Sequence, residues 1–152
     1  MKYRKNIRLK GFDYGQNGAY FVTICTDFKK DLIGQKEKLI LREELNQLPS
    51  RFKGVSLDYF VIMRNHLHVI FLFNESPVSL PKIVQAFKSI TTLRLKRQGF
   101  KGERFWQRNY YEHVIRGSKE LEKIRGYIQN NPLALELKFE RDKNRSSKVY
   151  FA

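Results

Sequence analysis

The feature that most constrains the fold is a long apolar run, residues 59–73, which is broken only once, by Arg64 and Asn65. Aliphatic, β-branched and aromatic residues in runs of this kind are typical of buried strands. The two polar residues suit a tight connection or a bulge, so we predict two strands, residues 55–63 and 66–73. A single long, bent strand is the alternative. In both cases the run predicts buried sheet.

The rest of the chain alternates between strand and helix patterns. In chain order we expect a strand at 20–26, a helix at 39–52, the two strands above, a helix at 79–97, a strand at 110–116 and a last helix between Ser118 and Pro132. This order predicts an α+β fold: a ferredoxin-like or RRM-like antiparallel sheet with helices on one face, plus a C-terminal helix that carries Tyr127. We expect a single domain over residues 1–152, with a core at about 5–133 and a charged tail at 134–152.

The charge of the chain favours a polyanionic partner. Thirty Lys and Arg residues face fifteen Asp and Glu residues, for a formal net charge of +15. We expect nucleic acid rather than a membrane, because no long basic amphipathic helix or lipidation signal is seen. The alternative is a basic protein kept soluble by its charge, and the interleaving of basic with aromatic residues favours nucleic acid over it. The single cysteine, Cys25, cannot form an internal disulfide. The basic segment at residues 1–10 is not followed by the apolar region typical of a signal peptide, and no stretch has the pattern of a membrane span. We therefore expect a cytoplasmic protein.

Two histidines on the second predicted strand suggest a metal site. His66 and His68 are two residues apart, so both imidazoles leave the same face of the sheet. Tyr127 and Asn131 are four apart, so they share a face of the last helix if that helix continues to Asn131. If this helix crosses the sheet near the histidines, the mixed nitrogen and oxygen ligands suit Mg²⁺ or Mn²⁺, although imidazoles also bind zinc. The alternatives are hydrogen-bonded histidines, a tyrosine at the rim of the core and an asparagine that ends a helix.

Several ordered motifs together resemble one known family. They lie at residues 7–14, 18–25, 64–68, 87–92, 105–113 and 127–132. The chain is similar over most of residues 3–133 to the single-tyrosine HUH transposases, and most of all to the REP-associated tyrosine transposases. It departs from the commonest pattern at Arg64, where proline is usual, and at 133–136, which replace a glycine-containing ending. The resemblance implies that the whole chain is one HUH-type transposase domain.

The resemblance also implies a chemistry. His66 and His68 are expected to hold a divalent metal, Mg²⁺ or Mn²⁺, with Asn131 as the third ligand. Tyr127 is the expected nucleophile, which attacks single-stranded or hairpin REP-like DNA to give a 5′-phosphotyrosine and a free 3′-hydroxyl. The chain is then a DNA strand-nicking and joining enzyme that works as a monomer or homodimer, associated with the bacterial nucleoid.

Basic and aromatic residues, several of them within these motifs, are candidates for DNA binding. The candidates for phosphate contact are Lys88, Arg94, Arg104, Arg108 and Arg116, and those for base stacking are Tyr110, Tyr111 and Trp106. Charged residues on helices are usually just solvated, and tryptophan is more often part of the core. For His113, we expect a structural hydrogen bond, with DNA contact as the second choice.

Two other functions compete with strand transfer. The first is a catalytically silent relative that binds hairpins without cutting them. The second is a metal-dependent nuclease that activates water and leaves no covalent adduct. The presence of His66, His68 and Tyr127 together favours the transferase over the silent relative.

Overall fold

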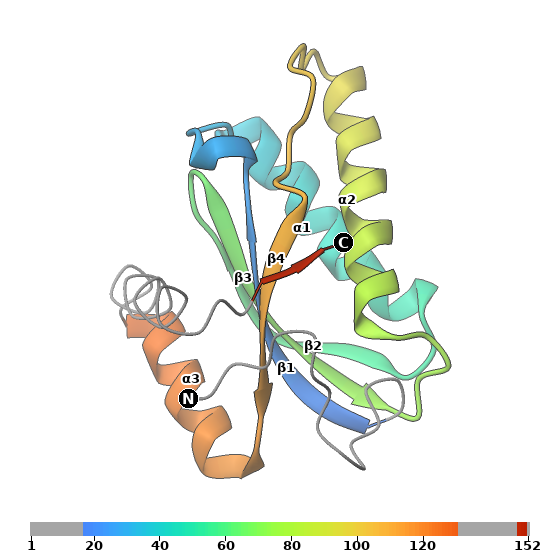
Figure 1. The fold of residues 1–152 in the computed structure, drawn as a ribbon, viewed down its shortest axis with the longest axis vertical. Helices are drawn as coiled ribbons and strands as arrows, with labels where there is room; N and C mark the ends of the chain where they lie inside the picture. The colour runs from blue at the N-terminus through green and yellow to red at the C-terminus, as the bar shows by residue number, and fades with distance from the viewer. Residues whose placement is uncertain (1–16, 131–148, 152) are drawn as a thin grey trace.

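The computed structural model describes residues 17–130 and 149–151, built around one antiparallel sheet (Figure 1). The elements in chain order are β1 (Asn17–Cys25), the short 3-10 helix η1 (Asp27–Lys29), α1 (Gln35–Arg51), β2 (Val55–Ile62), β3 (His66–Asn74), α2 (Leu80–Arg97), β4 (Asn109–Ile115), α3 (Gly117–Asn130) and β5 (Val149–Phe151). The strands lie in the order β2-β3-β1-β4-β5. The first four have the ferredoxin-like order, which confirms the predicted α+β fold.

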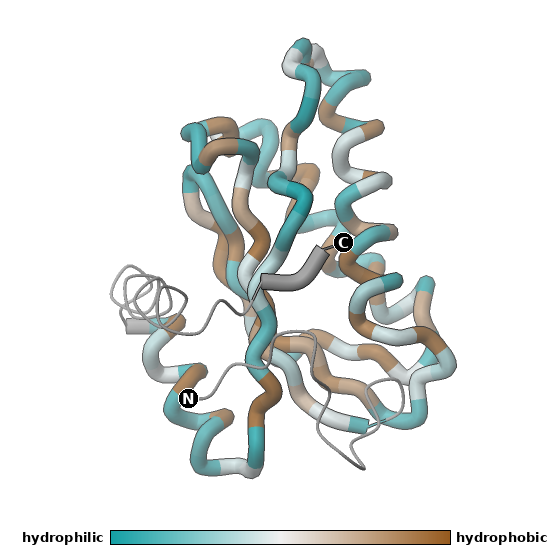
Figure 2. The backbone as a smooth tube through the Cα atoms, viewed as in Figure 1, coloured by the Kyte–Doolittle hydropathy of each residue, from teal (hydrophilic) through white to brown (hydrophobic). Residues whose placement is uncertain are grey.

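The helices cover both faces of the sheet. Figure 1 shows α1 and α2 together on one side and α3 on the other. The predicted C-terminal helix therefore lies across the sheet from the two helices that precede it. Hydrophobic and hydrophilic residues alternate along α2 and α3 (Figure 2), as expected for helices with one buried face.

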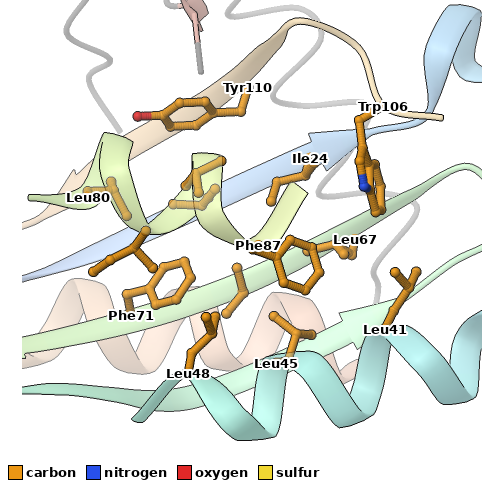
Figure 3. Close-up of a cluster of buried hydrophobic side chains, with 14 of the residues drawn as sticks. Ile24, Leu41, Leu45, Leu48, Leu67, Phe71, Leu80, Phe87, Trp106 and Tyr110 are labelled. Carbon is orange, nitrogen blue, oxygen red and sulfur yellow. The ribbon is translucent and has the colours of Figure 1, made fainter. Parts of the chain in front are cut away.

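Because alternate residues of a strand face opposite sides, each face has its own hydrophobic core. The main core, against α1 and α2, includes Tyr20, Val22, Ile24, Leu41, Leu45, Leu48, Leu67, Val69, Phe71, Leu80, Phe87, Trp106 and Tyr110 (Figure 3). The second core, against α3, consists of Phe21, Ile70, Ile115, Ile124 and Ile128. Leu121 and Tyr127 pack against the second core. The main core is much the larger, so most of the hydrophobic stabilisation comes from that face.

A bulge in β2 decides which of its residues face which core. The register with β3 shifts between Leu57 and Tyr59, which leaves Asp58 as the extra residue. Leu57 packs toward the main core, whereas Tyr59 packs toward the second core. The bulge therefore places Asp58 where it reaches α3.

Most element ends lie within a few residues of the prediction. Helix α1 begins at Gln35, earlier than expected, because the Glu37 carboxylate accepts a hydrogen bond from the backbone N–H of Gly34 at 3.0 Å. Ser79 precedes α2 and Pro81 lies in its first turn, as predicted. Within residues 17–130 and 149–151, no helix has both the length and the apolar character to cross a membrane.

Strand β5 was not expected from the sequence, which predicts only a charged tail at residues 134–152. It pairs with the first three residues of β4, and Tyr111 lies opposite Val149. The edge of the sheet at this end of β4 is thereby covered.

Candidate active site

The two histidines of β3 lie next to each other on the second-core face of the sheet. His66 is 2% exposed and His68 is fully buried, and their ring centroids are 4.7 Å apart. Leu67, between them, packs into the main core on the other face. The predicted placement of both imidazoles on one face is therefore confirmed.

Asn65 fixes the orientation of the His66 ring. Its side-chain Nδ2 donates a hydrogen bond to the backbone oxygen of Lys29 at 3.3 Å, so its Oδ1 faces His66. This oxygen lies 2.7 Å from His66 Nδ1 and can only accept, so Nδ1 carries the proton. The lone pair of the ring is then on Nε2. An imidazole held in this way is typical of a histidine that binds a metal through its other nitrogen.

His68 has a similar support and an unsatisfied nitrogen. Its Nδ1 lies 2.8 Å from the hydroxyl of Thr23, the residue opposite it on β1. Its Nε2 is buried without a hydrogen-bond partner among the residues that the structure describes. Burial, and then the nearby His66, hold the pKa of His68 well below its ordinary value. A neutral imidazole with a buried, unused nitrogen fits a metal ligand, since leaving such an atom unsatisfied costs free energy.

Of the predicted metal site, the structure describes only the two histidines. Within 17–130 and 149–151, no third His, Cys, Asp or Glu joins them. Asn131, the predicted third ligand, lies outside the described residues. The oxygen part of the mixed ligand set predicted from the sequence therefore stays a prediction.

Tyr127 lies on α3, on the same side of the sheet as the histidines. It is partly buried and packs against the second core. Phe21 of that core also lies 5.2 Å from the His68 ring, centroid to centroid. The helix with the tyrosine and the strand with the histidines are therefore joined by one hydrophobic cluster.

An ion pair and a hydrogen bond hold α3 against the sheet at two further points. Arg125 bonds both carboxylate oxygens of Asp58 in β2, and the distance from Nε to Oδ2 is 2.6 Å. At the start of the helix, Glu120 accepts hydrogen bonds from the His113 ring at 3.0 Å and from the backbone N–H of Arg116 at 2.9 Å. Burial raises the pKa of Glu120, but the Arg116 N–H and His113 lower it more, so the net pKa lies below its ordinary value. The structural role predicted for His113 is confirmed.

The predicted DNA-binding residues separate into groups. Arg104 and Arg108 are exposed and line a groove of about 480 Å³ between α2 and the segment that leads into β4. We call this the basic groove; its lining is Lys88, Ser89, Thr92, Leu93, Lys96, Glu103, Arg104, Phe105, Trp106, Gln107 and Arg108. Arg116 is also exposed but follows β4, at the opposite end of that strand from the groove.

Lys88 forms the inner wall of the basic groove. It is 8% exposed, and its Nζ donates hydrogen bonds to the backbone oxygens of Gln107 at 2.7 Å and Asn109 at 3.2 Å. Burial lowers its pKa to about 8, although Cys25 acts in the opposite direction. Lys88 therefore holds the groove segment against α2 as well as lining the groove.

Two of the predicted roles need correction. Tyr110 is 1% exposed and belongs to the main core, and Tyr111 and Trp106 are buried too, so none of the three presents a ring for base stacking. Trp106 donates from Nε1 to the Thr91 hydroxyl at 2.9 Å. Arg94 is engaged by two carboxylates of α1, Glu43 and Glu44, each at 2.8 Å. Its charge is paired with these carboxylates and joins the two helices, so Arg94 is a weaker candidate for phosphate contact than Arg104 and Arg108.

Sequence reasoning missed the residues that support the histidines. Thr23 was indistinguishable from any strand threonine, because its partner is distant in sequence. Asn65 had a signal, since an asparagine directly before a potential metal ligand can hydrogen-bond to it. The exposed ring of Phe28, in the loop that Asn65 binds, had no signal in the sequence.

Comparisons with known proteins agree with the geometry. Residues 15–131 match the family described as "Transposase IS200 like". A Haemophilus influenzae protein without a functional name is 36% identical, over 88% of this chain and 91% of its own length. Another from the same organism, 25% identical over 80% of this chain and 73% of its own, is named "Putative REP-associated tyrosine transposase". A solved REP-associated tyrosine transposase bound to a REP hairpin has the same fold, with a TM-score of 0.69 at 19% identity, covering 88% of this chain and 73% of that one.

Proposed function

This chain belongs to the IS200-like transposase family, and from that premise we propose that it nicks and joins single-stranded or hairpin DNA through a covalent bond to Tyr127. The observation that carries the proposal is the pair of buried, oriented histidines on the face of the sheet that α3 covers. A solved structure with this fold holds a REP hairpin, which supports the same class of substrate here.

His66 and His68 are the residues that we propose hold a divalent cation, Mg²⁺ or Mn²⁺, through their Nε2 atoms. Asn131 is the proposed third ligand. When bound, the cation offsets the negative charge that develops on the scissile phosphate. Asn65 and Thr23 keep the two rings in position, so the ligands need no rearrangement before binding.

Tyr127 supplies the nucleophile. Its phenol loses its proton as the oxygen attacks the phosphorus, and the bond from phosphorus to the 3′ oxygen breaks. That 3′ oxygen takes up one proton to become a 3′-hydroxyl, so the proton lost by the phenol is balanced. The DNA on the other side of the cut stays on the enzyme as a 5′-phosphotyrosine. Attack by another 3′-hydroxyl reverses the step, joins two strands and regenerates the tyrosine. No water and no external energy source take part.

The basic groove and the other exposed cations supply affinity for the phosphate backbone. Arg104, Arg108 and Lys96 line the groove, so binding should weaken as salt increases. Glu103 also lines the groove, and its negative charge partly offsets the positive charge there. We propose that the protein acts on chromosomal DNA in this way, as the family and its net charge of +15 suggest.

The test is covalent capture of DNA. The substrates are single strands that carry the palindromes flanking the gene, labelled at the 3′ end because a 5′-phosphotyrosine retains the 3′ fragment. The protein is incubated with Mg²⁺ or Mn²⁺ and run on a denaturing gel. Tyr127→Phe and His68→Ala are compared with Tyr59→Phe. Tyr59 is a matched control, because it packs against the same second core as Tyr127.

The expected result is labelled protein for the wild type and for Tyr59→Phe, and none for Tyr127→Phe or His68→Ala. Cleavage without labelled protein would replace this proposal by a nuclease that uses water. Binding without cleavage on every strand would replace it by a hairpin-binding protein.

A further inference from the structure

Phe28 is an exposed aromatic residue in a strained loop. It is 79% exposed, the highest value among the large hydrophobic side chains that the structure describes. Phe28 has a φ of 53° and Lys29 one of 54°, so two successive residues with side chains adopt the left-handed conformation. This conformation costs free energy at each such residue and persists only where the surroundings enforce it.

The loop is held in place from both sides. The Thr26 hydroxyl donates a hydrogen bond to the backbone oxygen of Lys30 at 2.7 Å. The backbone N–H of Lys29 donates one to the backbone oxygen of Thr26 at 2.9 Å. Asn65 donates from its side chain to the backbone oxygen of Lys29 at 3.3 Å. These bonds fix the conformation of the loop, and the Phe28 ring lies in solvent, outside both cores. Exposing a phenylalanine in this way does nothing for stability.

The same bonds place the loop between the metal ligands and the basic groove. Asn65, which binds the loop, also orients His66. On the other side, the backbone N–H of Asp27 donates to the oxygen of Phe105 at 2.8 Å, in the segment that lines the basic groove beside Arg104. A strand that runs from the groove toward the histidines would therefore pass the loop.

We infer that Phe28 is a stacking platform for an unpaired base of the DNA strand on its way to the histidine pair, an inference that rests on the proposed function. An aromatic face stacks on any base, which suits a strand held near the site of cleavage. Asp27 precedes Phe28 and two lysines follow it; Lys30 Nζ lies 5.7 Å from the centroid of the ring, so a cation for phosphate accompanies the platform. A protein partner would require a broader apolar patch than one exposed ring among charged residues.

The experiment measures binding of the DNA strand that gives the covalent adduct. Phe28→Asn removes the ring but suits the left-handed backbone, so the loop is kept. Phe28→Trp keeps an aromatic face and adds an exposed fluorophore, distinct from Trp106, which is buried. Leu39→Ala is the matched control, because it removes another large exposed side chain, on α1. Abasic sites are then moved one position at a time along the strand.

Phe28→Asn is expected to weaken binding by about 5-fold to 100-fold, while Phe28→Trp and Leu39→Ala bind like the wild type. DNA should quench the fluorescence of Phe28→Trp, and an abasic site at one position should abolish the quenching. Unchanged affinity in Phe28→Asn, or quenching that no abasic site alters, would overturn the role of Phe28 and leave the proposed function intact. No adduct and no binding by the wild type would overturn both.

Discussion

Arg125 of α3 binds both carboxylate oxygens of Asp58, the residue at the bulge of β2. The Asp58 side chain is 10% exposed, so this ion pair is largely shielded from solvent on its acidic side. It joins the helix that carries Tyr127 to the edge strand beyond the histidines. The position of the proposed nucleophile therefore depends on an interaction outside the second core.

Removing this ion pair should reduce the rate of covalent capture but change the affinity for DNA much less. We expect Arg125→Met to reduce the rate of adduct formation by about 10-fold to 100-fold, because small displacements of a reacting group are costly. Single-turnover capture and fluorescence anisotropy separate the two effects. Glu43→Gln, which breaks an ion pair with Arg94 across the main-core helices, is the control and should leave capture unchanged. An equal loss in both variants would contradict the role of the pair.

Removing the Asn65 side chain should reduce metal affinity more than it reduces the stability of the fold. Asn65→Ala removes the acceptor for His66 Nδ1, and losing such a support typically costs about 10-fold to 100-fold in metal affinity. Titration calorimetry with Mn²⁺ measures the change. Asn74→Ala, an exposed asparagine at the far end of β3, is the matched control. Unaltered Mn²⁺ affinity in Asn65→Ala would show that His66 needs no such support.

The buried ammonium of Lys88 should make stability depend on pH. Its pKa is about 8 in the folded protein, below the ordinary value of 10.5, so the unfolded chain binds more protons between these values. The free energy of unfolding therefore rises with pH from about 8 to 10.5, by roughly 3 kcal/mol in full, and this gain is lost as pH falls through 8. Urea unfolding across this range should show the slope in wild type.

Two variants isolate this effect. Lys88→Met should abolish the contribution, so that its difference from wild type changes with pH. Lys101→Met, at an exposed lysine, should run parallel to wild type. A constant difference between Lys88→Met and wild type from pH 8 to 10.5 would mean that folding does not lower the pKa of Lys88.

The turn before β2 depends on a glycine for two separate reasons. Gly54 has a φ of +80°, and a Cβ there would lie 2.4 Å from the backbone oxygen of Asn74. Gly117 has a similar φ, +86°, but open space around its Cα. We expect Gly117→Ala to lower the free energy of unfolding by about 1 kcal/mol, because of its backbone conformation alone. Gly54→Ala should lower it clearly more, because its Cβ also meets the backbone oxygen of Asn74. Equal losses in thermal or urea unfolding would show that the loop at Gly54 adjusts.

Periodicity was enough to predict the order and type of the main elements. The apolar run at residues 59–73 divides at Arg64 and Asn65 into two paired strands, as expected, since alternation and polar breaks are local properties. The bulge at Asp58 was not predictable, because nothing in a strand sequence marks which residue its partner will skip. Strand β5 also depends on pairing with a distant segment.

The candidate site was predictable only in part. His66 and His68 share a face because strand geometry requires it, and that prediction is confirmed. The stacking role of Tyr110 was wrong because composition shows that aromatic residues are present but not which of them the core requires. Arg94 was misjudged for a similar reason: its acidic partners lie on α1, far away in the sequence. The position of Asn131 stays a prediction.

The two separate cores have a consequence for how the protein tolerates mutation. The sheet works as a partition: packing with α1 and α2 accounts for most of the buried hydrophobic surface, while the histidines and Tyr127 lie on the side with the small core. Substitutions in the main core should lower the yield of folded protein. Substitutions on the side of the second core should lower activity while the yield stays normal. Residues on the α3 side can therefore change, and with them the DNA that the protein acts on, while the main core keeps the fold stable.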